Sequence, residues 1–264
     1  MPEEQPVTST AFEGDPATSG IKQAMAPLLQ AALNGSRPPA EHPAVPRTPD
    51  QLAAEARAAV DAGAQLLHLH PYDAEDVETL AAEPCAAALR AVRAACPSVP
   101  LSLSTSAGIE TDPRRRLDLV ASWNELPDLV TANQGESGIL ELCEHLIARE
   151  VGIEAGLLSV ADAEAFARSV IADRCVRALV EPLDPRPGEA VADAAAMEDA
   201  LLGADASLEQ VHHGDGVASW AVNARALGRG HGIRTGLEDT TVLPDGRPAA
   251  GNAALVRAAV EMMS

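Results

Sequence analysis

The sequence predicts a single (β/α)8 TIM barrel, an α/β fold, from three observations. Short apolar runs alternate with longer segments of helical periodicity, and eight of each kind follow one another. The apolar runs lack the alternation of half-exposed strands, which is typical of a parallel sheet covered on both faces. Eight strand–helix units over about 240 residues match the size of a closed barrel. A doubly wound open sheet, the structural alternative, is disfavoured because no GxGxxG follows the first apolar run.

The elements follow in order along the chain. The first stretch is acidic and rich in Pro, Ser and Thr, so we expect residues 1–20 to be a flexible tail outside a barrel domain of residues 21–264. The expected strands are the apolar runs Pro27–Leu33, Ala64–His70, Val99–Ser104, Asp128–Ala132, Gly152–Leu158, Arg177–Glu181, Leu208–His212 and Ile233–Leu237. The expected helices are the segments Thr48–Ala62, Val77–Ala95, Pro113–Asn124, Ser137–Glu150, Ala161–Arg174, Glu189–Leu202, Ala218–Arg229 and Asn252–Met262. Thr48 before Pro49 marks a helix start, because threonine caps helices and proline suits the first position.

The composition limits the partners of the protein. The chain has 39 Asp and Glu against 19 Lys and Arg, and 2% aromatic residues, so it lacks the basic stripe and the stacking platform of a nucleic-acid binder. No apolar run approaches the roughly 18 to 20 residues of a membrane span, and no signal-peptide pattern opens the chain. The four cysteines are far apart and form no CxxC, which predicts reduced thiols. We therefore expect a cytoplasmic protein without membrane or nucleic-acid partners.

Polar residues gather where the expected strands end. In barrels of this type the active site lies at the C-terminal ends of the strands. The polar positions there are Asn34, His68, His70, Ser104, Thr105, Asn133, Glu154, Glu181, His212, His213, Arg234, Glu238 and Asp239. So polar a set after apolar strands predicts a catalytic mouth.

The pair His68 and His70 predicts a metal site. Residues two apart in a strand point to the same face, so both imidazoles would project into the barrel mouth. They supply two nitrogen ligands, and a carboxylate from elsewhere would complete three. The alternative is that one histidine is a hydrogen-bonded core residue and the other faces the helices.

The segment Arg234–Asp239 at the last strand offers that carboxylate. By the same alternation Arg234, Gly236 and Glu238 share a face, and the glycine leaves space between two charged groups. Glu238 would complete a His/His/Glu site. Asp239 would then be a general base held by Arg234, although a surface salt bridge before a helix is the alternative.

These segments together resemble the β-keto acid cleavage enzymes, of which 3-keto-5-aminohexanoate cleavage enzymes are the best-known members. The resemblance covers nearly the whole chain after the tail. The motifs that carry it, in order, are LNGSR, AGAQLLHLHPYD, LSLSTSAG, GIEAGLLSVADAEAF, HHG and GIRTGLEDT.

The resemblance implies an enzyme with one zinc ion per chain that condenses a β-keto acid with acetyl-CoA, giving acetoacetate and a new acyl-CoA. It implies zinc ligands at His68, His70 and Glu238, and proton abstraction and charge stabilisation by Asp239 with Arg234. Ser104 would donate to developing oxyanions. It also implies a homo-oligomer, either a dimer or a tetramer. The pocket residues implied by the resemblance, or expected from their place at the mouth, are Asn34, Thr105, Asn133 and Glu154.

Three features leave questions open. Tyr72 stands where family members commonly carry arginine, and Arg37 is a candidate replacement that would disfavour a cationic substrate. The alternation does not decide which of His212 and His213 faces inward. The run Arg114, Arg115 and Arg116 is either a clamp for the phosphates of CoA or a solvated face.

Two other functions remain possible from the sequence. One is another metal-dependent barrel enzyme, a hydrolase or a lyase that cleaves an acyl-CoA without acetyl-CoA. The histidines of amidohydrolase-type barrels are absent from the expected fifth and sixth strands, which disfavours a hydrolase of that type. The other is an inactive barrel that acts as a scaffold, and it would carry no stoichiometric metal.

Overall fold

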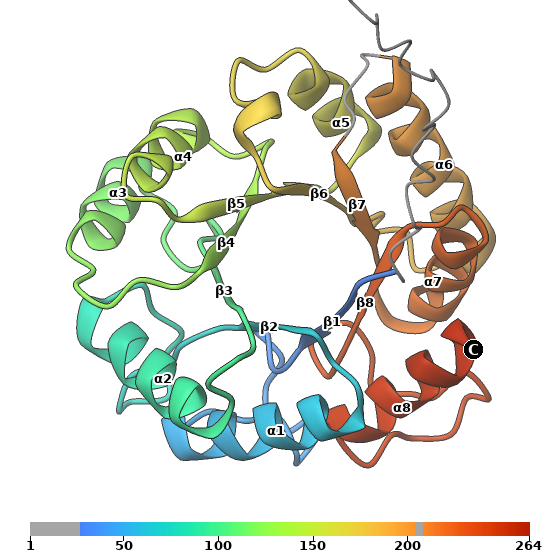
Figure 1. Ribbon diagram of the computed structural model, residues 1–264, viewed down its shortest axis with the longest axis horizontal. Helices are drawn as coiled ribbons and strands as arrows, with labels where there is room; N and C mark the ends of the chain where they lie inside the picture. The colour runs from blue at the N-terminus through green and yellow to red at the C-terminus, as the bar shows by residue number, and fades with distance from the viewer. Residues whose placement is uncertain (1–26, 204–207) are drawn as a thin grey trace, which may run out of the picture.

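The predicted barrel is confirmed in a computed structural model, which describes residues 27–203 and 208–264. Within these residues eight parallel strands close into a single barrel, because β1 pairs with both β2 and β8 (Figure 1). The expected tail of residues 1–20 lies outside the described residues. The strands are β1 (Leu29–Ala32), β2 (Leu66–Leu69), β3 (Leu101–Ser104), β4 (Leu129–Asn133), β5 (Gly152–Leu157), β6 (Arg177–Val180), β7 (Glu209–His212) and β8 (Gly232–Thr235).

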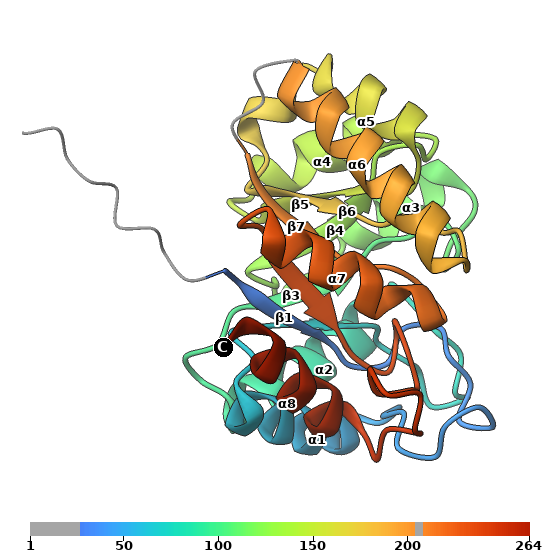
Figure 2. The same cartoon turned by 90° about the vertical axis from the view of Figure 1, so that its right-hand side faces the viewer.

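A helix follows each strand and packs on the outside of the barrel (Figures 1 and 2). The helices are α1 (Pro49–Ala62), α2 (Ala82–Ala95), α3 (Pro113–Ala121), α4 (Ile139–Ile147), α5 (Val160–Ala167), α6 (Pro187–Gly203), α7 (Ser219–Gly228) and α8 (Asn252–Met263). Two short 3-10 turns, Ala172–Arg174 and Gly216–Ala218, complete the described elements. None of the described helices has the length and apolar character needed to cross a membrane.

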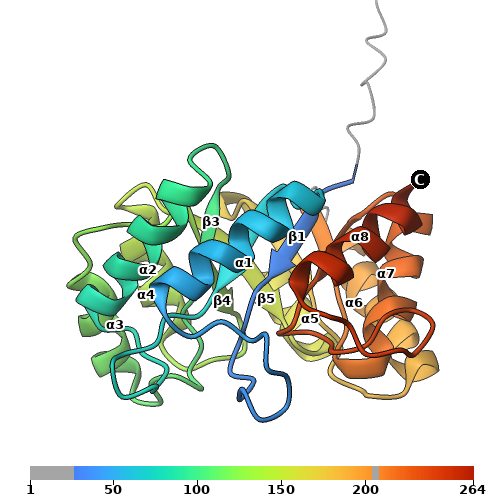
Figure 3. The ribbon, with the colours of Figure 1, turned by 90° about the horizontal axis from the view of Figure 1, so that it is seen from below.

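Side chains at the strand ends face the barrel mouth. In Figure 3 the arrow of β1 points toward the lower side, where the loops that follow β1 and β8 extend. Leu67 and Leu69 of β2 join the apolar core between sheet and helices, so His68 between them points into the barrel. All four cysteines are buried and free, as the sequence predicts.

Helix α1 begins as expected. The Thr48 hydroxyl accepts a hydrogen bond from Gln51 N, and the Gln51 side chain accepts one from Thr48 N, which makes a full capping box before Pro49.

Helix α2 begins at Ala82 rather than at Val77. Pro84 explains the difference, because proline fits the first turn of a helix and breaks its interior. The preceding residues form a loop in which Glu78 bridges to Tyr72. Glu78 is thereby directed into the mouth instead of lying on a helix.

Strand β8 ends at Thr235, before the expected Leu237. The chain then passes close to β1, and a Cβ at Gly236 would lie 1.9 Å from the carbonyl oxygen of Ala32. Only glycine allows this approach. The loop that follows carries Glu238 and Asp239 at the mouth.

Candidate active site

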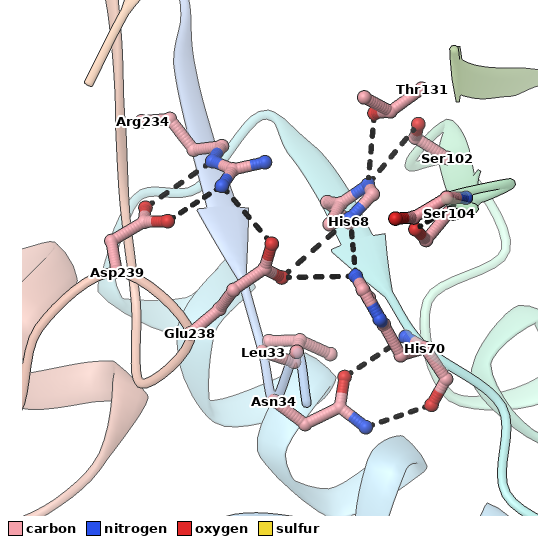
Figure 4. A network of polar contacts seen from close by, with 12 residues as sticks. Leu33, Asn34, His68, His70, Ser102, Ser104, Thr131, Arg234, Glu238 and Asp239 are labelled. Atoms are coloured by element: carbon pink, nitrogen blue, oxygen red, sulfur yellow. Dashed lines mark hydrogen bonds and ion pairs between the residues drawn. The ribbon is translucent and has the colours of Figure 1, made fainter. Parts of the chain in front are cut away.

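Three side chains converge at the mouth as the sequence predicts. His68 Nε2 and His70 Nε2 are 3.1 Å apart, and Glu238 Oε2 lies 3.6 and 3.5 Å from them (Figure 4). Among the described residues this Oε2 has no hydrogen-bond partner although it is buried. Such an orphaned oxygen between two imidazole nitrogens is the arrangement that a cation would satisfy.

The spacing of the three atoms fits a small metal ion. Ligands at about 2.0–2.1 Å from a tetrahedral ion lie about 3.4 Å apart. The three observed separations, 3.1, 3.5 and 3.6 Å, are close to that value. His68, His70 and Glu238 are also the only His, Cys, Asp or Glu cluster of this kind in the part of the chain that the structure describes.

Two neighbours orient His70. Asn34 accepts from His70 N at 2.9 Å and donates to His70 O at 2.8 Å, while Glu78 contacts the ring at Nδ1. A carboxylate at Nδ1 keeps the proton there and leaves Nε2 free for a metal. Asn34 also donates to Pro46 O, so it holds the ligand strand, and its expected contact with substrate stays untested.

Hydroxyl groups orient His68. Its Nδ1 lies 3.4 Å from Ser102 Oγ and 3.3 Å from Thr131 Oγ1, and Ser102 donates to Glu154. The Ser102 hydrogen is therefore directed to Glu154, and its oxygen accepts from Nδ1–H. Nε2 of His68 is thereby left free to bind a metal.

Glu154 lies beneath His68 and not in a substrate pocket. Its carboxylate is 0% exposed and accepts from Gln30 Nε2 at 3.3 and 3.2 Å and from Arg177 Nη1 at 3.0 Å. A carboxylate with these donors is closed to substrate. The expectation that Glu154 lines the pocket is therefore corrected, because register places it one layer too deep.

Arg234 links Glu238, one of the three candidate metal ligands, to Asp239, the expected base. Its Nη2 donates to Glu238 Oε1 at 3.1 Å and to Asp239 Oδ1 at 2.6 Å, and its Nε donates to Asp239 Oδ2 at 3.3 Å. Gly35 makes room for this arrangement, because a Cβ there would lie 2.4 Å from Glu238 Cγ. The backbone of Gly35 is also left-handed (φ 56°), which favours glycine.

Burial and charge oppose each other in this cluster. Burial alone would raise the pKa of Glu238 and of Asp239, yet the Arg234 guanidinium holds both below their usual ranges. Burial lowers the pKa of His68 to about 3. Burial would lower that of His70 as well, but Glu238 and Glu78 raise it to about 9.

Arg37 holds the loop after β8 rather than facing a substrate. Its guanidinium donates to Leu237 O at 2.6 Å and to Glu238 O at 3.1 Å, and it pairs with Glu41 at 2.6 Å. The expectation that Arg37 repels a cationic substrate therefore loses its basis. The Tyr72 hydroxyl donates to Gly35 O at 2.7 Å, which fixes the loop that follows β1.

His213 faces the mouth and His212 does not, which resolves the open choice. The His212 ring stacks on His231 at 4.7 Å on the helix side of β7. His213 is 0% exposed, and its Nδ1 lies 3.5 Å from Asp239 Oδ1. Its Nε2 lies 3.5 Å from Glu181 Oε2, so His213 stands between two carboxylates.

The three arginines at the start of α3 differ in their exposure to solvent. Arg116 is 1% exposed, donates to Glu136 Oε2 at 2.5 Å and is closed to CoA by this pair, which corrects that expectation. Asn133 donates to the other oxygen of Glu136 at 3.0 Å. Arg114 and Arg115 are exposed, so only these two can meet a ligand from solvent.

Ser104 and Thr105 have different surroundings. Ser104 ends β3 at the mouth (Figure 4), and its hydroxyl accepts a long bond from Ser106 N at 3.4 Å. The Thr105 hydroxyl donates to Thr131 O at 2.8 Å, so it ties β3 to β4. Ser104 is the better placed of the two for contact with a substrate.

Sequence reasoning missed Glu78 and Glu136. Both lie in loops, where contacts follow no period. Pro84 was the one available signal, because it placed Glu78 before the helix rather than in it. For Glu136 the sequence carries no comparable signal.

The fold and the site define the class of protein: a (β/α)8 barrel with a possible His/His/Glu metal site and a carboxylate–arginine pair beside it. The family model of the beta-keto acid cleavage enzyme matches residues 28–181 and 183–264, and the chain belongs to this family. The family points to an enzyme that cleaves β-keto acids.

Curated relatives agree with the family. The chain is 27% identical over 248 residues to the 3-keto-5-aminohexanoate cleavage enzyme of Fusobacterium nucleatum, covering 89% of this chain and 90% of the relative. It is 31% identical over 123 residues to the enzyme of the same name from Acetoanaerobium sticklandii, covering 46% and 45%.

Solved structures show the same fold. The apo structure of ObcA matches with a TM-score of 0.66 at 21% identity, covering 83% of this chain and 61% of ObcA. The complex of ObcA with a C4-CoA adduct and oxalate matches with a TM-score of 0.67 at 19% identity, covering 83% and 63%. This chain thus spans about three fifths of the ObcA chain.

Proposed function

We propose that the protein is a zinc-dependent enzyme that condenses a β-keto acid with acetyl-CoA and releases acetoacetate and a new acyl-CoA. The observation that carries the proposal is the convergence of two imidazole nitrogens and an orphaned carboxylate oxygen next to a second, arginine-held carboxylate. The first three atoms suit a metal, and the fourth group suits a base.

Zinc is the metal that the donor set favours. Two imidazoles and one carboxylate with room for further ligands are typical of catalytic zinc sites. When bound, the ion would supply Lewis-acid polarisation of the keto acid, which acidifies the carbon between ketone and carboxylate.

The chain's own residues would move the proton and hold the charges. Asp239 takes the proton from C2 of the β-keto acid, while Arg234 keeps the Asp239 carboxylate ionised and aimed. The C2 carbanion attacks the thioester carbon of acetyl-CoA, and the Ser104 hydroxyl can donate to the developing oxyanion. The released CoA thiolate then attacks the original ketone, the C2–C3 bond breaks, and C2 regains a proton.

The requirement for acetyl-CoA distinguishes the proposed enzyme from a lyase and from an inactive scaffold. ObcA has been solved in complexes with a C4-CoA adduct and with oxaloacetate, which supports a CoA ester and a keto acid as ligands for a barrel of this shape. Arg114 and Arg115 are the exposed cations that could meet CoA phosphates. A lyase would need no acetyl-CoA.

The test is a screen of β-keto acids with purified, zinc-loaded protein. Each acid is incubated with and without acetyl-CoA, and acetoacetate and acyl-CoA are followed by mass. We expect both products only when both substrates are present. Turnover of an acyl-CoA alone would indicate the lyase, and a protein that retains no zinc after loading and forms no product would indicate the scaffold. The homo-oligomer stays a prediction, which light scattering of the same sample measures.

A further inference from the structure

His213 is a buried imidazole that the proposed reaction does not yet use. It follows β7, its backbone N donates to Val180 O at 3.1 Å, and its side chain is 0% exposed. Neither ring nitrogen has a hydrogen-bond partner among the described residues. Leaving both nitrogens of a buried imidazole unpaired is costly, so the position calls for an explanation.

The two nitrogens face two different carboxylates. Nδ1 lies 3.5 Å from Asp239 Oδ1, and Nε2 lies 3.5 Å from Glu181 Oε2. Both separations exceed a normal N–H···O bond by only a few tenths of an ångström, and catalytic hydrogen bonds are often long before substrate binds. A small shift of the ring or of the carboxylates would therefore bring both pairs of atoms within hydrogen-bond distance.

The two carboxylates differ in their access to solvent. The Asp239 side chain is 2% exposed, whereas that of Glu181 is 22% exposed. Glu181 directly follows β6 and is fixed there, because its backbone N donates to Leu157 O at 2.9 Å. Asp239, His213 and Glu181 thus run from the interior of the site to its surface.

The proposed reaction needs a place to keep a proton. The C2 proton is removed at the start and returned at the end, and the thioester exchange happens between the two steps. Asp239 already accepts hydrogen bonds from Arg234 at both carboxylate oxygens, at 2.6 and 3.3 Å, so the proton is better kept on a neighbouring group. The neighbouring imidazole has two ring nitrogens, so it can accept a proton at one and give up a proton at the other.

We propose that His213 relays the C2 proton between Asp239 and Glu181; this inference rests on the proposed function. The proton leaves Asp239 Oδ1 and bonds to Nδ1, and the O–H electron pair returns to the carboxylate. The resulting imidazolium passes its Nε2 proton to Glu181 Oε2, which leaves a neutral imidazole with the new proton on Nδ1. The return of the proton reverses the step, so the cycle needs no further reactant. His213 acts through Asp239 and is a positioning and relay residue.

The first experiment uses His213→Asn in the full-length, zinc-loaded protein. Asparagine keeps a polar group near Nδ1 but cannot carry a proton. Three quantities are measured: metal per chain, turnover with acetyl-CoA, and exchange of the C2 hydrogens of the β-keto acid for deuterium in D2O without acetyl-CoA, corrected by an enzyme-free blank. We expect unchanged metal, and turnover and exchange both lower by roughly 100-fold, the lower end for proton transfer.

His212→Asn is the matched control. It removes the neighbouring imidazole, which faces the helices and lies outside the site, and we expect wild-type exchange per folded molecule. Glu181→Gln is the second variant. Its amide oxygen still accepts from Nε2 but takes no proton, so we expect slower exchange with a smaller loss of turnover.

The outcomes separate the inference from the function beneath it. If the wild type neither exchanges C2 hydrogens nor forms products, the proposed function fails. If the wild type does both and His213→Asn stays within twofold, or loses its metal, the relay is refuted. Loss of turnover with wild-type exchange also refutes it, and wild-type exchange in Glu181→Gln removes Glu181 from the relay.

Discussion

Two buried glutamate–arginine clusters in this barrel have opposite character. Glu198 on α6 is 2% exposed, and its two oxygens accept from Arg225 at 2.5 Å and from Arg229 at 2.9 Å. Glu238 at the mouth has one oxygen on Arg234 at 3.1 Å and one without a partner. Burial and charge are common to both clusters. What differs is that only the second leaves a carboxylate oxygen without a hydrogen-bond partner among the described residues.

This difference gives a rule for locating the site. A carboxylate with both oxygens on arginines stabilises packing, here between α6 and α7, because its bonds are complete within the protein. A carboxylate held by one oxygen is oriented, but its second oxygen has no hydrogen-bond partner and could bind a metal. Variants of the two glutamates test whether the clusters separate in this way.

The largest effect is expected at the unsatisfied glutamate. Glu238→Ala removes one of three metal ligands, so we expect loss of most bound zinc and of measurable turnover, with a folded protein. His70→Ala should behave alike. Zinc per chain is measured by elemental analysis and folding by circular dichroism. A Glu238→Ala protein with full zinc would place the metal elsewhere.

The next effect concerns the residue beside it. Asp239→Asn keeps the hydrogen-bonding shape and leaves the ligand trio intact, so zinc should stay bound. Turnover should fall by about 10² to 10⁴, the usual contribution of a general base. Zinc content and rate are measured on one preparation. Loss of zinc here, with zinc retained in Glu238→Ala, would show that the two roles are exchanged.

The saturated cluster should affect stability and leave the site alone. Glu198→Gln leaves two arginines without their carboxylate, and loss of hydrogen bonds between charged groups costs about 1 to 3 kcal/mol where one arginine is partly exposed. Urea unfolding at pH 7 measures the loss, and zinc content should not change. Loss of zinc in this variant would contradict the separation of the two clusters.

The same variant has a pH signature with a defined sign. Burial would raise the pKa of Glu198, but Arg229, His231 and Arg225 lower it to about 2. Its stabilisation is therefore complete above the unfolded pKa of about 4.3 and is lost as the pH falls toward 2. The difference in free energy of unfolding between wild type and Glu198→Gln should shrink over that range. A constant difference from pH 6 to pH 3 would refute this account.

The sequence predicted the convergence of His68, His70 and Glu238 for a physical reason. Alternation along β2 placed both histidines on one face, and the glycine and charge pattern after the last strand pointed to Glu238 as the carboxylate beside them. Periodicity also gave the eight strand–helix units. It could not give the partners in loops, because their contacts depend on how distant segments pack: Glu78 reaches His70, and Arg37 holds the loop after β8.

Depth within the barrel was the second limit. Glu154 ends no strand; it lies inside β5, where Ser102, Gln30 and Arg177 surround it. A sequence shows which residues share a face, but the stagger of neighbouring strands decides which layer each one occupies. The expected contact between Glu154 and substrate was wrong for that reason.

A smaller effect is expected at the support of His70. Glu78→Gln removes the charge next to Nδ1, and loss of such a partner typically weakens metal binding by about 10- to 100-fold. Competition with a zinc chelator measures the affinity. Glu83→Gln, an exposed change on α2, is the control. Equal affinities in both variants would limit Glu78 to shaping the loop.

The smallest effect is expected for the two exposed arginines at the start of α3. Arg114 and Arg115 are exposed, and Arg115 pairs with Glu110 at 2.9 Å in a setting that solvent screens. Changing both to Gln should raise the apparent KM for acetyl-CoA by about two- to fivefold, the range for an exposed pair, with little effect on the β-keto acid. Added salt should weaken the wild type more than this variant, because screening acts on the charges that the variant lacks. Arg116→Gln is the contrasting change: it breaks the buried pair with Glu136 and should lower stability instead of acting on acetyl-CoA alone. Equal KM values and equal salt dependence in wild type and double variant would leave the exposed pair as a solvated face.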